Sequence, residues 1–306
     1  MLRTRVDPIL YNNREIANNR TSQPMSAKFA ARSRTAAGGP VSRGRRDSFL
    51  LAVMFLLSSC ASGPQSPAHA VPSDYYHWNE AATDRPAGWV VILPGSSGLS
   101  VFDDDRHYFD AANRYNELGF DVLVVDYKPA VRASANAPEG ASPGGKIEWI
   151  TERAIEWMWH EHPRTRTRQG VIAAWSLGAE GAMRLVNDDR KTKSLQIGSA
   201  VFFYPTNFEQ VELDNQVPLL ILIGDNDDVT PAAAARAMVE NRSPGTAAVE
   251  LIVYPGARHG FDIESLKTPR TIRLLPMFGP SATFFYDPDA ARDASKRVSA
   301  FLTENQ

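Results

Sequence analysis

VIAAWSLGAEGA, at residues 171–182, is the stretch of this sequence that decides the fold. Its pattern predicts a short apolar strand, a tight turn with Ser176 at the apex, and the first turn of a helix. Such a turn pushes the serine hydroxyl out of the sheet. The helix N-terminus behind it offers unpaired N–H groups that can hold a developing oxyanion. Residues 174–178 match the nucleophile elbow G-x-S-x-G, with Ala174 in place of the first glycine. On these five residues alone, an ordinary turn of small residues explains the pattern equally well.

The rest of the chain body alternates predicted strands with predicted helices. Each strand is a continuous apolar run, as expected where both faces of a sheet are covered. Strands are expected at residues 89–93, 121–126, 171–175, 200–204, 218–223 and 249–254, helices at 107–118, 146–160, 177–187, 232–240 and 287–304, and irregular chain at 129–145 and 264–285. This alternation predicts an α/β fold with a mainly parallel central sheet and helices on both faces. Functional residues of such sheets gather at the carboxyl ends of the strands.

A serine hydroxyl is a poor nucleophile at neutral pH and needs a base beside it. Of the six histidines, only His259 lies in a loop directly after a predicted core strand and downstream of Ser176. A carboxylate must hold the imidazole in the right tautomer. The loop after the fifth predicted strand offers Asp225, Asp227 and Asp228. The order serine, aspartate, histidine is the chain order of the α/β-hydrolases.

From about residue 88 to 303, the sequence resembles the dienelactone hydrolase family of the α/β-hydrolases. The resemblance rests on four motifs, PGSSG at residues 94–98, AWSLG at 174–178, GDNDDVTP at 224–231 and YPGARHGF at 254–261. It implies the α/β-hydrolase fold. The family's acid matches Asp227, with Asp228 as the second candidate, and its base matches His259.

The resemblance also implies that the backbone N–H groups of Leu177 and Ser96 form the oxyanion hole. The enzyme that names the family uses a cysteine nucleophile, whereas this chain has Ser176, and the groups that hold the dienelactone carboxylate are not recognisable. Many serine-containing relatives are general carboxylesterases. We therefore expect a serine hydrolase that cleaves small-molecule carboxylic esters through an acyl-enzyme, and we expect no metal site and no cofactor.

Two other functions remain open at this stage. A serine peptidase or amidase of the same fold is one, because nothing in the loops distinguishes an ester from an amide. A surface-anchored binding protein with a decayed site is the other, and Ala174 in place of glycine is its motivation. Among the neighbouring residues, Trp175 is expected to pack under the turn, Tyr204 to pack among aromatic rings, and Glu180 to lie on a solvated helix position.

The charge of the chain is divided unevenly. The formal net charge is −2, but residues 1–59 carry +7 and the remainder carries −9. An acidic body gives no reason to expect nucleic acid as a partner. The only cysteine is Cys60, so no internal disulfide can form.

The basic leader at residues 1–59 is expected to end in a lipoprotein-type signal peptide. FLLAVMFLL, at residues 49–57, is too short to span a membrane, and it follows a basic region as in secretory signals. The next residues complete Leu-Ser-Ser-Cys, which resembles the lipobox of bacterial lipoproteins and implies cleavage before Cys60 and its lipidation. Met25 is an alternative start. RRDSFL at residues 45–50 resembles a twin-arginine motif with one residue too many, so Sec and twin-arginine export both remain open.

Residues 60–86 are rich in Pro, Ser and Ala, and they are expected to tether the lipidated cysteine to a hydrolase domain at residues 87–306. Ala61 stands where an inner-membrane retention signal would favour aspartate. The sequence therefore predicts an exported protein that is lipid-anchored to the cell envelope, at the periplasmic face of the outer membrane. A Sec signal that ends near Ala61, with an incidental cysteine, is the alternative. The sequence does not determine the oligomeric state.

Overall fold

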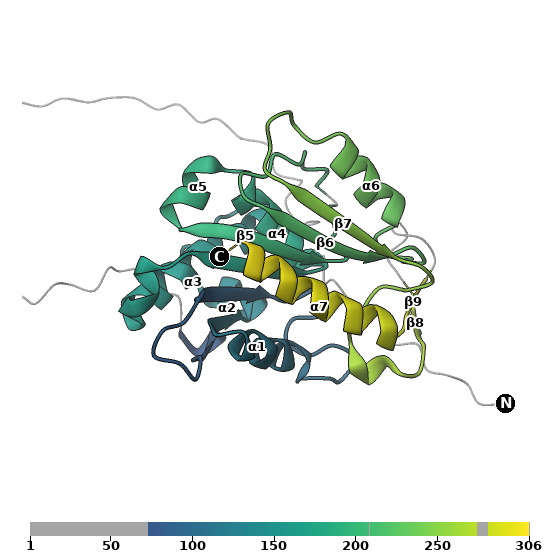
Figure 1. Ribbon diagram of the computed structural model, residues 1–306, viewed down its shortest axis with the longest axis horizontal. Coiled ribbons are helices and arrows are strands. Elements are labelled where there is room, and N and C mark those ends of the chain that lie inside the picture. The colour runs from purple at the N-terminus through teal and green to yellow at the C-terminus, as the bar shows by residue number, and fades with distance from the viewer. Residues whose placement is uncertain (1–72, 208, 274–280, 306) are drawn as a thin grey trace, which may run out of the picture. The chain divides into compact units, whose positions relative to one another are not determined.

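The computed structural model describes residues 73–207, 209–273 and 281–305 (Figure 1). The predicted leader, Cys60 and the tether up to residue 72 lie outside the described residues. Seven strands form one sheet in the order β1-β3-β2-β4-β5-β6-β7. They are β1 (Tyr76–Asn79), β2 (Gly88–Leu93), β3 (Phe120–Val125), β4 (Gly170–Trp175), β5 (Ile197–Phe203), β6 (Leu219–Gly224) and β7 (Val249–Tyr254). Neighbouring strands are parallel, except that β1 is antiparallel to β3.

Helices cover both faces of the sheet, as the alternating pattern predicts. They are α1 (His107–Glu117), α2 (Tyr127–Ala133), α3 (Pro143–Glu161), α4 (Leu177–Val186), α5 (Asp189–Ser194), α6 (Ala232–Glu240) and α7 (Pro288–Glu304). α1 and α7 pack on one face, and α2, α3 and α4 pack on the other. Figure 1 shows α7 crossing in front of the strands. None of these helices of the described chain is long and apolar enough to cross a membrane.

The apolar strands build the core on both sides. Successive side chains of a strand point to opposite faces. In β2, Val90 and Ile92 therefore join the core under α1 and α7, while Val91 and Leu93 join the core under α3 and α4. All four are fully buried. This two-sided burial explains why the strands are continuous apolar runs rather than alternating ones.

The folded unit begins before the predicted boundary at residue 87, which corrects the expected domain limit. Residues 76–79, predicted as part of the tether, form β1 and pair with residues 122–125 of β3. Their sequence, YHWN, contains no apolar run. The strand forms because β3 offers it backbone partners and because the Trp78 ring stacks on His162 at 4.0 Å between ring centroids.

Three further segments differ from the expected pattern. Residues 129–145, predicted to be irregular, contain the end of α2 and the start of α3. α5 was not predicted because its sequence, DRKTKS, has no apolar stripe; the Asp188 side chain caps its first turn instead. The segment 264–285 contains a 3₁₀ turn (Glu264–Leu266) and a two-stranded sheet of β8 (Arg270–Ile272) and β9 (Ala282–Phe284), and residues 274–280 lie outside the described chain.

Candidate active site

Ser176 lies at the sharp turn between β4 and α4, as the elbow motif predicts. Its backbone angles are φ 48° and ψ −116°, a region that non-glycine residues rarely occupy. Small residues permit this turn. A Cβ added to Gly178 would lie 2.4 Å from the carbonyl oxygen of Leu93, so only glycine fits where α4 passes the end of β2. The backbone strain at Ser176 is held by this close contact between helix and strand.

His259 lies in the loop after β7 and contacts Ser176 across 83 positions of sequence. Its Nε2 is 3.0 Å from Ser176 Oγ, and its Nδ1 is 2.8 Å from Asp227 Oδ2. All three side chains are buried. With the Nδ1 proton donated to the carboxylate, Nε2 is free to accept the serine proton, which is the tautomer that a general base requires.

Asp227 and Asp228 have different surroundings, although they are adjacent in sequence. Asp227 faces His259 and is buried, whereas Asp228 pairs with Arg258 at 2.8 Å on the surface. The Asp228 carboxylate also accepts a hydrogen bond from the backbone N–H of Thr283. The third aspartate of this loop, Asp225, accepts a hydrogen bond from the Gly256 N–H and so connects the loops after β6 and β7. The geometry therefore assigns a different neighbour to each aspartate, and only Asp227 lies against the imidazole.

The turn at residues 94–98 lies against the elbow. A Cβ added to Gly95 would be 3.3 Å from the Ser176 Cβ. Three side chains hold the successive peptide units of this turn. The Tyr108 hydroxyl accepts from the Gly95 N–H, the Tyr127 hydroxyl donates to the Gly95 carbonyl, and Lys128 Nζ donates to the Ser96 carbonyl, at 2.7–2.9 Å.

These contacts fix the direction of one predicted oxyanion donor, the Ser96 N–H. The C=O and N–H of a trans peptide point in opposite directions. Binding of the Gly95 carbonyl by Tyr127 therefore orients the Ser96 N–H away from Tyr127. Within the described chain, the N–H groups of Ser96 and Leu177 donate to no protein group. Both N–H groups are therefore available to a substrate oxygen.

Sequence reasoning missed the residues that support Asp227, the predicted acid. The backbone N–H groups of Val229 and Thr230 donate to Asp227 Oδ1 at 2.8 and 2.7 Å, and the Thr230 hydroxyl donates to Oδ2 at 2.9 Å. These donors hold the carboxylate in the orientation that meets His259. The run Asp-Asp-Val-Thr is the signal that could have found them, because an aspartate commonly accepts from backbone groups two and three residues on.

The structure also places three flanking residues of the elbow. Trp175 packs under the turn and Tyr204 packs among aromatic rings, as expected. Glu180, predicted on a solvated position, is instead buried, and it accepts hydrogen bonds from the Glu209 N–H and the Thr206 hydroxyl. The sequence did not show this because the segment that covers α4 comes from beyond β5. Among the described residues, no group of three His, Cys, Asp or Glu side chains is arranged to hold a metal ion.

A family model described as "Dienelactone hydrolase family" matches residues 80–305. The chain belongs to the dienelactone hydrolase family. As a member it is a carboxylesterase-like hydrolase with the α/β-hydrolase fold. The comparison with curated proteins gives no match.

Several solved structures share the fold at low sequence identity. A Klebsiella pneumoniae protein assigned as a dienelactone hydrolase has a TM-score of 0.53 at 15% identity, over 75% of this chain and 99% of that one. Esterase 2 of Thermogutta terrifontis, phosphorylated by paraoxon, has a TM-score of 0.52 at 16% identity, over 75% and 88%. A Thermoplasma acidophilum protein assigned as a CIB-like hydrolase has a TM-score of 0.51 at 15% identity, over 75% and 92%.

Proposed function

We propose that this hydrolase cleaves carboxylic esters, with Ser176 as nucleophile, His259 as base and Asp227 as the residue that orients the base. One observation carries the proposal, namely the continuous hydrogen-bonded series from Asp227 Oδ2 through both ring nitrogens of His259 to Ser176 Oγ. A buried series of this kind is the arrangement that activates a hydroxyl for acyl transfer.

The proposed reaction proceeds in two halves. Ser176 Oγ attacks the ester carbonyl carbon while His259 Nε2 takes the hydroxyl proton. The N–H groups of Leu177 and Ser96 bind the oxygen that becomes negative. As the tetrahedral intermediate collapses, His259 returns the proton to the leaving alcohol and an acyl-serine remains. Water then attacks the acyl carbon while His259 takes its proton, and His259 passes that proton to Ser176 Oγ as the bond to the acyl carbon breaks, which releases the carboxylic acid.

The test is hydrolysis of p-nitrophenyl esters of increasing acyl length by the full chain and by Ser176→Ala. We expect hydrolysis by the native chain only, together with labelling of Ser176 by a fluorophosphonate probe. The acyl length with the highest kcat/KM sizes the acyl pocket. A folded native chain that is inactive on every ester, and unlabelled, contradicts the proposal and favours the decayed binding protein.

A matched amide distinguishes the peptidase or amidase alternative. The same acyl group is presented as a p-nitrophenyl ester and as a p-nitroanilide. We expect the ester to be hydrolysed at least about 10²-fold faster, and comparable rates would assign the chain to amide cleavage instead. No contact in the described residues favours the amide.

We further propose that the enzyme is exported and lipid-anchored through Cys60 at the cell envelope. The support is the Leu-Ser-Ser-Cys sequence after an apolar run, in the basic leader. The measurement is incorporation of labelled fatty acid into the full chain and into Cys60→Ala. We expect label in the native chain alone, in the membrane fraction. If neither form carries the label and both appear in the same cell fraction, the proposed lipid anchor is contradicted.

A further inference from the structure

Asp262 is a largely buried carboxylate that the proposed reaction does not use. It lies three residues after His259, and its side chain is 9% exposed. Its Oδ2 accepts a hydrogen bond from Trp175 Nε1 at 2.8 Å, and its Oδ1 accepts one from the Tyr204 hydroxyl at 2.7 Å. One carboxylate thus binds the residue before the nucleophile and an aromatic ring beside the base.

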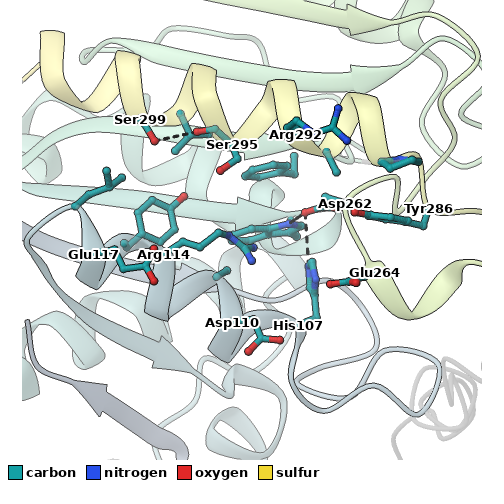
Figure 2. Close-up of a pocket in the computed structure, with 18 of the residues that line it drawn as sticks. His107, Asp110, Arg114, Glu117, Asp262, Glu264, Tyr286, Arg292, Ser295 and Ser299 are labelled. Carbon is teal, nitrogen blue, oxygen red and sulfur yellow. Dashed lines mark hydrogen bonds and ion pairs between the residues drawn. The ribbon is translucent and has the colours of Figure 1, made fainter.

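Within the described residues, His107 is the only basic side chain at ion-pair distance from the Asp262 carboxylate. His107 Nε2 is 3.6 Å from Asp262 Oδ2 and makes no hydrogen bond. Burial lowers the pKa of His107, against the opposing effect of the Asp262 charge, and so disfavours the cationic imidazole. Figure 2 shows the two side chains facing each other in a cavity of about 430 Å³ between α1 and α7. Within the described residues, the hydrogen bonds to this carboxylate come from neutral donors, Trp175 and Tyr204, so its charge acts on the groups around it.

Tyr204 connects this charge to the base. Its ring centroid is 4.4 Å from that of His259, with the ring planes at 55°. Burial, followed by the charge of Asp262, raises the pKa of Tyr204 well above its usual value, so the phenol keeps its proton and donates it to the carboxylate. A phenol that donates to an anion has a more electron-rich ring, and such a ring attracts a cation. His259 becomes a cation when it takes the proton of Ser176.

We infer that Asp262 is a positioning residue for the hydrolysis, which acts through Tyr204 to orient His259 and to stabilise its imidazolium form. This inference rests on the proposed function. Asp262 touches none of the reacting atoms, and its hydrogen bonds go to Trp175 and Tyr204. Its effect reaches the imidazole through the tilted Tyr204 ring, whereas Asp227 contacts Nδ1 directly.

The other groups around His259 limit what a change at Asp262 can alter. Asp227 and Ser176 meet the two ring nitrogens, and Phe284 of β9 packs edge-on at 5.3 Å between ring centroids without adding charge. The preceding Arg258 is paired with Asp228 on the surface. Replacement of Asp262 by asparagine therefore removes one negative charge near the ring and leaves every direct partner of His259 in place.

The test compares the full native chain with Asp262→Asn, whose side chain has the same size and can still accept from Trp175. We expect kcat to fall about tenfold with KM unchanged within about twofold, because in the transition state the imidazolium loses stabilisation and the ring also loses part of its orientation. The acidic limb of the kcat/KM–pH profile is expected to move to lower pH by about half a unit, because loss of a negative charge disfavours the protonated ring.

Two further variants separate this effect from a general loosening of the fold. Tyr204→Phe removes the same connection and is expected to give the same shift. In the Tyr204→Phe background, Asp262→Asn is expected to change kcat by less than about twofold, since coupled residues are not additive.

Asp121→Asn is the matched control, because Asp121 is a buried aspartate paired with Arg164 at the opposite end of the sheet. It is expected to lower stability without moving the acidic limb.

An NMR titration of the His259 ring makes the result independent of catalysis. The His259 signal is assigned by its loss in His259→Gln, and its midpoint is compared between the native chain and Asp262→Asn. A downward shift supports the coupling even if no ester is hydrolysed, in which case only the proposed function fails. An unchanged midpoint in folded Asp262→Asn, or an equal shift in Asp121→Asn, overturns the inference. If Asp262→Asn does not fold, Tyr204→Phe decides the question in the same way.

Discussion

The two faces of the sheet hold the candidate active site in different ways. On the face under α3 and α4, the helices approach so closely that a Cβ added to Gly181 would lie 2.4 Å from Ile147 Cγ2. This face carries α4, and therefore the turn at Ser176. On the face under α1 and α7, the packing includes the polar pair of Asp262 and His107 beside a cavity (Figure 2). Tyr204 from this core lies against His259. Close packing of helix on strand holds the turn at Ser176, with hydrogen bonds to the buried Glu180 of α4 beside it, whereas His259 is held by the hydrogen bond of Asp227 and by the Tyr204 ring.

The largest effect is expected from Ser176→Ala, which separates chemistry from packing. Loss of the nucleophile is expected to lower kcat by a factor on the order of 10⁶. The midpoint of thermal unfolding should stay within about 2 °C of that of the native chain, because the hydroxyl contributes no packing to the face under α3 and α4. Ester hydrolysis and a calorimetric scan measure the two quantities. A large loss of stability would show that the serine is part of the support and not only of the chemistry.

Asp227→Asn is expected to lower kcat by about 10⁴, because the asparagine holds the wrong tautomer of His259. Its matched control is Asp228→Asn, which removes a surface pair with Arg258 and is expected to change kcat by less than about twofold. Both are measured with one ester substrate at one pH. If the two variants lost equal activity, Asp227 could not be assigned as the acid in preference to Asp228, and the surface pair of Asp228 would also contribute to holding His259.

Matched valines test the packing of the two faces directly. Val186 of α4 is fully buried on the face under α3 and α4, whereas Val298 of α7 lines the cavity on the face under α1 and α7. Val186→Ala is expected to cost about 2–3 kcal/mol of unfolding free energy and Val298→Ala about 1 kcal/mol, because the second side chain has fewer atoms around it to lose. Urea unfolding of the two variants supplies the comparison. Equal losses of unfolding free energy would mean that the cavity does not weaken the packing on the face under α1 and α7.

The smallest effect is expected from Tyr127→Phe, which removes one hydrogen bond from the turn beside the elbow. The Gly95–Ser96 peptide then loses a donor to its carbonyl, although the Gly98 N–H still binds that oxygen. We expect kcat to fall roughly three- to tenfold, as for one neutral hydrogen bond, with the unfolding free energy changed by about 1 kcal/mol. A kcat that is unchanged would show that Gly98 alone orients the Ser96 N–H.

Much of the architecture followed from local sequence. The buried strands were predictable because each is an apolar run bounded by turn residues, and the elbow because small residues surround one serine. Elements without such a pattern were missed. β1 exists only because β3 offers it an edge, and α5 has no apolar stripe. Glu180 was misplaced because its burial depends on a segment that follows β5.

The sequence by itself determined the fold class, the family and the order of the serine, the aspartates and the histidine, because these depend on short motifs and on hydrophobic patterning. Only the tertiary structure decided which aspartate meets His259, because Asp227 and Asp228 are chemically equal neighbours that a turn points in different directions. Tertiary structure alone also brought Asp262 to Trp175 and Tyr204, across 87 and 58 positions of sequence. No local pattern encodes such contacts, since they depend on how loops from separate strands meet at one edge of the sheet.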